Sequence, residues 1–78
     1  MNVYKLTPEF GWTNAVGMAL VAAHTYEQAK YEYMQHGSYA EEVATGNINF
    51  TKSSDIAIVG LHAEGNEPRI ICDSIHFV

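Results

Sequence analysis

The chain has 78 residues and a mass of 8.7 kDa, which is enough for one small hydrophobic core, so we expect a single domain over residues 1–78. Apolar residues make up 47% of the sequence and charged residues 17%, which is typical of a folded globular chain and excludes a disordered one. Lys and Arg total 4 against 9 Asp and Glu, giving a net charge of −5 that argues against direct binding to nucleic acid or to an anionic membrane.

The single cysteine, Cys72, excludes an internal disulfide and favours a reducing compartment. The first residues, Met1 to Pro8, resemble neither a signal peptide nor a transit peptide. The longest apolar run, Ala15–Ala23, is shorter than the ~20 residues of a membrane span. We therefore expect a cytoplasmic protein, in a host cell, with no membrane contact.

Two strands are expected in the first third of the chain. Asn2–Leu6 alternates, with Val3 on one face, and Thr7-Pro8 ends it because proline donates no ladder hydrogen bond. A turn-rich connection, Phe10–Asn14, leads to Ala15–Ala23, which we interpret as a strand covered on both faces. One face of this strand carries Val16, Met18, Leu20 and Ala22, and the other carries Ala15, Gly17, Ala19, Val21 and Ala23.

A helix follows, with clear signals at both ends. Thr25 and Gln28 form a capping box at its start, and His36 with Gly37 marks its end, where Gly37 is free to adopt the left-handed cap. Three- and four-residue spacing predicts that one face meets the sheet. This face consists of Tyr26, Ala29, Tyr33 and Met34.

A second helical signal comes directly after the first helix. Ser38 and Glu41 again match a capping box, which predicts one or two further turns over Tyr39–Ala44, ending at Gly46. The polar segment that follows has Ile48 and Phe50 as expected anchors.

The last third of the chain predicts a β-hairpin. Strands over Ile56–His62 and Arg69–Phe77 flank a turn over Ala63–Pro68, and this pairing would set His62 opposite Ile70. On the last strand, alternation puts four residues on one face: Ile71, Asp73, Ile75 and Phe77.

The predicted fold is α+β: a two-layer ββαββ domain with a four-stranded antiparallel sheet and one main helix, plus a short second helix, on one face. Both sheet faces are partly apolar, and one helix covers only one of them. We therefore expect a homo-oligomer, most simply a dimer.

No constellation for catalysis or metal binding is found. The spacing of the four histidines, His24, His36, His62 and His76, matches no metal-binding motif. Cys72 and His76 share a strand face but lie ~13 Å apart along it, too far for a hydrogen bond. We expect no catalytic residue, no metal, no cofactor and no enzymatic activity.

Exposed aromatic and acidic residues are the best candidates for a binding surface. Tyr31 is turned away from the buried stripe, and the predicted patch, which we call the helix patch, consists of Tyr31, Tyr39, Glu27, Glu41 and Glu42. An ordinary solvated helix face is the alternative. The turn around Glu64 and Arg69 is the next candidate surface.

The strand-to-helix passage Val21–Lys30 is similar to a pattern in many very small proteins encoded by phages and mobile elements. In those proteins an apolar strand ends in small residues, and a capped helix begins with an acidic pair and an alanine. The ββαββ layout and acidic charge also resemble several anti-CRISPR and other anti-defence proteins. This resemblance implies a small non-enzymatic inhibitor, and it carries over no functional residue because no diagnostic site motif matches.

Three functions are therefore considered. The first is an inhibitor that binds a protein component of a host defence system through acidic side chains. The second is an oligomeric sponge that sequesters a small nucleotide immune signal. Its phosphate-binding residues would be Lys5, Lys30, Lys52 and Arg69. The third is a structural oligomerising module.

Overall fold

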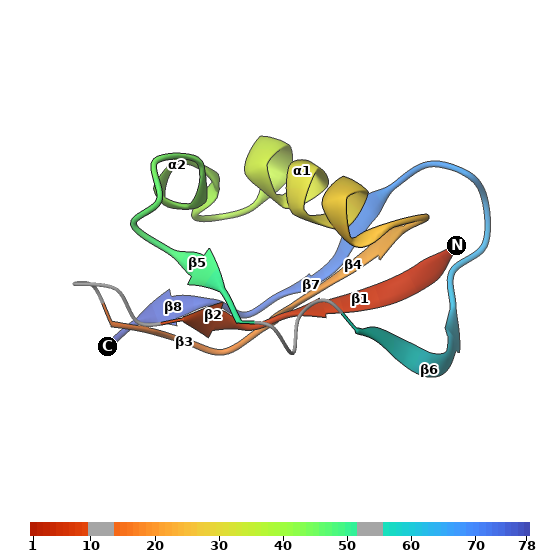
Figure 1. The fold of residues 1–78 in the computed structure, drawn as a ribbon, viewed down its shortest axis with the longest axis horizontal. Coiled ribbons are helices and arrows are strands. Elements are labelled where there is room, and N and C mark those ends of the chain that lie inside the picture. Colours follow the sequence, from red (N-terminus) through yellow and green to blue (C-terminus); the bar gives the residue numbers. More distant parts are fainter. Residues whose placement is uncertain (10–13, 52–55) are drawn as a thin grey trace.

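The computed structural model describes residues 1–9, 14–51 and 56–78. Its two helices, α1 (Tyr26–His36) and α2 (Ala40–Ala44), lie over one face of a four-stranded antiparallel sheet (Figure 1), which confirms the α+β class. The sheet has the order β6-β1-β4-β7, and its strands are β1 (Asn2–Leu6), β4 (Ala19–Ala23), β6 (Ala57–His62) and β7 (Arg69–Asp73). Four two-residue strands interrupt the simpler ββαββ order: β2 (Pro8–Glu9) pairs with β5 (Asn49–Phe50), and β3 (Ala15–Val16) pairs with β8 (His76–Phe77).

The core lies between the helices and the two central strands. Tyr4 and Leu6 of β1 are buried there beneath α1, as the alternation predicts. The small-residue face of the predicted second strand also faces the helices, and it contributes Ala15, Ala19, Val21 and Ala23. Small side chains on this face let α1 approach the sheet closely, so Tyr33 and Ala29 of α1 are fully buried against it. Ile48 and Phe50 are buried as predicted.

The predicted strand Ala15–Ala23 is split in two at Gly17. Gly17 has a φ of +106°, which side chains of L-residues rarely adopt, and a Cβ atom there would overlap the carbonyl oxygen of Ser74. Ser74 crosses the break by donating from its backbone N–H and from its hydroxyl to the carbonyl oxygen of Met18, each at 2.9 Å. The break therefore separates β3–β8 from the main sheet.

The start of α1 is capped as predicted. The backbone N–H of Gln28 donates to Oγ1 of Thr25 at 3.1 Å, and Oε1 of Gln28 accepts from the backbone N–H of His24 at 2.7 Å. The prediction that Gly37 adopts a left-handed conformation at the end of α1 is wrong, since its φ is −70°. Glycine is required there because a Cβ atom would overlap the ring of Tyr33.

The further turns expected after α1 form a second helix, α2, which is separate from α1, but the capping box predicted at Ser38 is wrong. Tyr39 is the N-cap residue of α2 and makes no side-chain capping bond. The hydroxyl and backbone N–H of Ser38 both donate to Oδ2 of Asp73, at 2.9 and 2.8 Å. A carboxylate on β7 thus replaces the helix backbone as the partner of Ser38.

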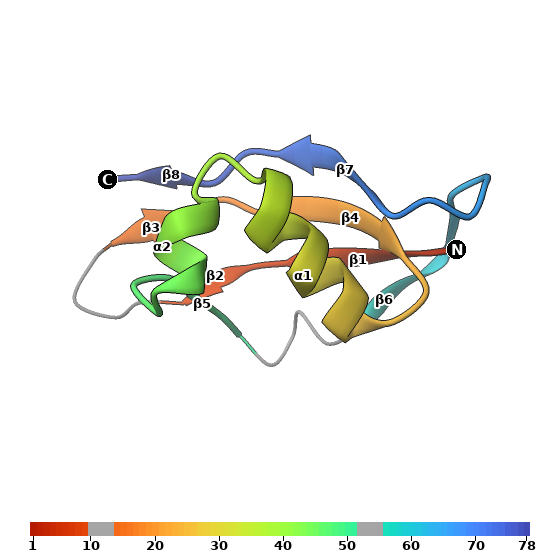
Figure 2. The same ribbon diagram turned by 90° about the horizontal axis from the view of Figure 1, so that it is seen from above.

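The predicted hairpin is also wrong, because β6 and β7 lie at opposite edges of the sheet. The six residues 63–68 cross from one edge to the other past the ends of β1 and β4 (Figure 2), and His62 pairs with Asn2 instead of Ile70. Both edge strands are irregular. Four residues of β6 bulge between its two pairs with β1, Asn2↔His62 and Tyr4↔Ala57.

In β7 the register shifts, so that Leu20 pairs with Cys72 and Val21 with Ile70, and Ile71 has no direct partner. This bulge overturns the face predicted for Ile71, Asp73, Ile75 and Phe77. Asp73 lies on the helix side, where it accepts from the hydroxyl of Tyr33 at 3.2 Å. Ile71 lies on the other side of the sheet, where it lines a hollow with Leu20.

Candidate functional site

The α1 part of the helix patch is solvent-exposed. Glu27 and Tyr31 are one helical turn apart and therefore share a face of α1, and Tyr31 is 62% exposed. Glu32 has a histidine partner one turn later, with 3.6 Å between its Oε1 and Nε2 of His36. Glu27, by contrast, is exposed to solvent.

The α2 part of the helix patch is divided between solvent and packing. Glu41 is exposed and Glu42 half-buried, both in the first turn of α2. The ring of Tyr39 packs edge-to-face on Phe77, with 4.6 Å between ring centroids. Tyr39 therefore anchors β8 beneath the helices. The two helices lie in one layer on the same side of the sheet (Figure 1), so the residues of the patch on α1 and on α2 belong to the same side of the molecule.

The basic residues of the nucleotide hypothesis are not gathered at one place. Lys30 belongs to α1, while Lys5 lies opposite Leu20 on the sheet face turned away from α1. Arg69 starts β7, and its Nη1 donates to the carbonyl oxygens of Glu64 and Glu67 at 2.9 and 3.3 Å. Lys52 lies outside the described residues, as do the first four residues of the predicted connection 10–14.

The second surface is the sheet face turned away from the helices, which we call the open face. The strand register arranges it in rows: Val3, Ala22 and Arg69 are neighbours in one row, and Lys5, Leu20 and Cys72 in the next. Val3 and Ala22 are buried, whereas Ile71 is 50% exposed. Figure 1 shows β6 on this side of the sheet, away from the helices.

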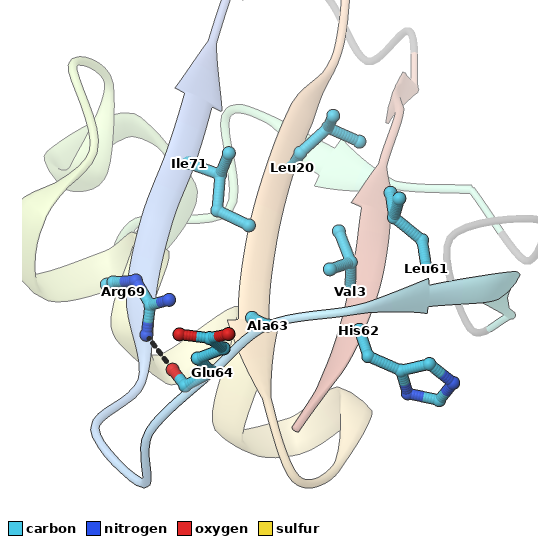
Figure 3. Close-up of a pocket in the computed structure, with 8 residues that line it drawn as sticks. All are labelled: Val3, Leu20, Leu61, His62, Ala63, Glu64, Arg69 and Ile71. Carbon is cyan, nitrogen blue, oxygen red and sulfur yellow. Dashed lines mark hydrogen bonds between the residues drawn. The ribbon is translucent and has the colours of Figure 1, made fainter.

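A hollow of about 460 Å³ opens on this face (Figure 3). Its floor is apolar, with Val3, Leu20 and Ile71 pointing into it, while Leu61 of β6 closes one side. Arg69 and Glu64 stand at its rim, and the imidazole of His62 points away from it. Two hydrogen bonds between the backbones of Met1 and Ala63, of 3.0 and 3.1 Å, fix the start of the crossing loop.

Sequence reasoning expected an apolar sheet face that the helix does not cover, but it missed the hollow on that face, because the hairpin prediction placed β6 beside β7. A signal was present in the sequence. Ile58 and Val59 are consecutive apolar residues, so an edge strand that carries both must expose one of them. Val59 is 95% exposed.

The buried polar group beneath the helices has a structural role. Burial raises the pKa of the Tyr33 hydroxyl, whose proton is donated to Asp73.

All four histidines are exposed. Among the residues that the structure describes, no three His, Cys, Asp or Glu side chains are grouped so that they could hold a metal ion.

No helix within the described ranges is long and apolar enough to cross a membrane. Comparisons with protein-family models, with curated proteins and with solved structures gave no match for this chain.

Proposed function

We propose that this chain is a non-enzymatic binding protein that inhibits a host defence component by presenting its helix patch to a basic region of a protein partner. The inhibitor class is what the resemblance of Val21–Lys30 implies. The observation that carries the proposal is the exposure of Tyr31 and of Glu27, one turn before it, on the outer face of α1.

Charge on this side is predominantly negative. The two helices contain Glu27, Glu32, Glu41 and Glu42 against one lysine, Lys30. Such a field accelerates encounter with a basic surface and repels other acidic proteins. It gives orientation and speed more than affinity, because exposed charge pairs contribute little net free energy.

Affinity would come from Tyr31. A tyrosine buries a large, rigid ring at low cost in conformational entropy and keeps a hydroxyl for hydrogen bonding, so it is a favoured anchor at interfaces. Its position one turn after Glu27 places the ring beside a charge that can pair at the rim of the contact.

The nucleotide sponge is less well supported by this geometry. Lys30 and Lys5 lie on opposite sides of the sheet, and Nη1 of Arg69 is committed to two backbone carbonyls. A phosphate group needs several donors that converge on one point.

The test compares two charge-reversal variants in capture experiments from host cells, with the captured partner identified by mass spectrometry. Glu41→Lys with Glu42→Lys changes the helix patch, whereas Glu9→Lys with Glu67→Lys changes the net charge by the same amount outside α1 and α2. We expect the first variant and Tyr31→Ala to lose the partner at least ~10-fold, and the second to keep it.

Equal loss in both double variants would mean that only net charge matters, and retention by all three would exclude the helix patch. In that case the loop around Glu64 and Arg69 would become the next candidate binding surface. Far-UV circular dichroism of each variant confirms that the comparison is made between folded proteins.

A further inference from the structure

The hollow on the open face has the size and the lining of a small-molecule site. Its volume of about 460 Å³ lies within the ~300–1,000 Å³ of ligand pockets, which combine apolar walls with a few polar groups. Val3 of its floor is buried, whereas Leu61 and Ile71 are 44% and 50% exposed. A small apolar group placed in the hollow would therefore cover side chains that the folded chain leaves in water.

The wall of the hollow is held in place by hydrogen bonds. The crossing loop forms one end of it and joins the edge strands β6 and β7. At its start the backbones of Met1 and Ala63 are bonded at 3.0 and 3.1 Å. Farther on, Nη1 of Arg69 donates to the carbonyl oxygens of Glu64 and Glu67 at 2.9 and 3.3 Å. A wall fixed before binding lowers the entropy cost of taking up a ligand.

Arg69 offers a carboxylate-binding edge at the rim. Its Nη1 is engaged by the two carbonyl oxygens, and no other group in the described part of the chain accepts a hydrogen bond from Nε or Nη2. These two nitrogens form one side of the planar guanidinium, which binds a carboxylate through two parallel hydrogen bonds. The backbone thus orients the guanidinium without occupying this edge.

Glu64 provides the opposite charge at the same rim, beside Arg69 (Figure 3). Its carboxylate is exposed and forms no ion pair with any described residue. A simple acid would be attracted by Arg69 but repelled by Glu64 and by the net charge of −5, and a simple amine would be repelled by Arg69. A molecule that carries an ammonium and a carboxylate group side by side complements both residues.

We propose that the hollow binds a free aliphatic α-amino acid such as leucine. The carboxylate of the ligand pairs with Nε and Nη2 of Arg69, and its ammonium group pairs with Glu64. Its branched side chain rests on the floor of Val3, Leu20 and Ile71. The inference is independent of the proposed function, since the hollow and the helix patch lie on opposite sides of the sheet. Because both charged groups are exposed and the ligand is small, we expect a dissociation constant of about 0.1–1 mM.

The test is a titration of the full chain followed by the backbone amide signals in NMR spectra. Leucine is compared with two probes of the same carbon skeleton: 4-methylpentanoic acid, which lacks the ammonium group, and isopentylamine, which lacks the carboxylate. We expect leucine to shift the signals of Val3, Leu20 and Ile71 and to bind at least ~3-fold more tightly than either probe. Alanine, which is three carbon atoms smaller, should bind at least ~10-fold more weakly than leucine, because each buried CH₂ group adds to the affinity.

Glu64→Gln is the site variant and Glu67→Gln is its matched control. Both remove one exposed carboxylate from the crossing loop, but only Glu64 lines the hollow. Glu64→Gln should weaken leucine binding at least ~3-fold and strengthen the binding of 4-methylpentanoic acid, because it removes an attraction for the first and a repulsion for the second. Glu67→Gln should leave the order of the probes unchanged.

The comparison of the probes on the unmodified chain keeps the test decisive if Glu64→Gln does not fold. The absence of saturable shifts up to ~20 mM leucine overturns the proposal. Binding of 4-methylpentanoic acid or isopentylamine as tight as that of leucine overturns it as well, and so does an effect of Glu67→Gln equal to that of Glu64→Gln.

Discussion

Replacing Asp73 by alanine tests the structural link between β7 and the helical layer. Its carboxylate accepts three hydrogen bonds, from the Tyr33 hydroxyl at 3.2 Å and from the backbone N–H and hydroxyl of Ser38 at 2.8 and 2.9 Å. The first joins the sheet to α1, and the other two hold the turn between α1 and α2. Asp73→Ala removes all three at once while leaving the β4–β7 backbone pairing in place.

The magnitude follows from burial. Tyr33 is fully buried, so leaving its hydroxyl proton without an acceptor costs ~1–3 kcal/mol. The two bonds from Ser38 are solvent-exposed and together contribute ~1 kcal/mol. We expect Asp73→Ala to lower the free energy of unfolding by about 3 kcal/mol, which for a chain of this size lowers the melting temperature by ~12–24 °C.

The assay is urea unfolding followed by far-UV circular dichroism, carried out on a double-mutant cycle with Tyr33→Phe. In the Tyr33→Phe background there is no hydroxyl left without an acceptor when Asp73 is removed. Asp73→Ala should therefore lower the free energy of unfolding by only ~1 kcal/mol in that background. The coupling free energy would then be ~2 kcal/mol. Equal costs in both backgrounds, or a cost below ~0.5 kcal/mol in the unmodified chain, would refute the assigned role of the carboxylate.

Two further outcomes are expected. Because burial raises the folded-state pKa of Tyr33, the unfolded chain loses this proton first, so stability should be intact below about pH 10 and fall as the pH rises further. Urea midpoints at pH 9 and pH 11 measure this fall, and a Tyr33→Phe variant that falls as steeply would contradict the assignment. Gly17→Ala should lower the free energy of unfolding by ~3 kcal/mol or prevent folding, since it adds a clash with Ser74 to the cost of a positive φ. Gly46→Ala, at a φ of +85° with open space around it, should cost only ~1 kcal/mol, and similar thermal midpoints for the two variants would show the clash to be absent.

The features that local sequence determines were predictable. Thr25 and Gln28 satisfy the first turn of α1 by short-range bonds, so the start of the helix can be read from four residues. Alternation along Ala15–Ala23 predicted which residues share a face, and the structure adds that the face with the small side chains is the one that packs against the helices, because a helix packs closest where side chains are small.

The errors concern partners that are distant in sequence. The six residues 63–68 could join two neighbouring strands as a hairpin, or they could join the two edge strands by crossing the end of the sheet. In the observed strand order, β6 and β7 are three strand spacings apart, or ~14 Å, and six extended residues span ~20 Å, so the length of the loop does not distinguish the two connections. Nothing near Ser38 indicates that Asp73, 35 residues later, binds it in place of the helix backbone. The placement of Tyr39 on Phe77 depends in the same way on the pairing of β3 with β8.

The irregular edges of the sheet bear on how the protein avoids fibre formation. A flat, regular edge strand offers an unbroken row of N–H and C=O groups, on which strands of further copies can be added without limit. Here the bulge of β6 between Ala57 and His62 and the register shift at Ile71 in β7 interrupt that row at both edges. Growth along the sheet is therefore hindered in both directions.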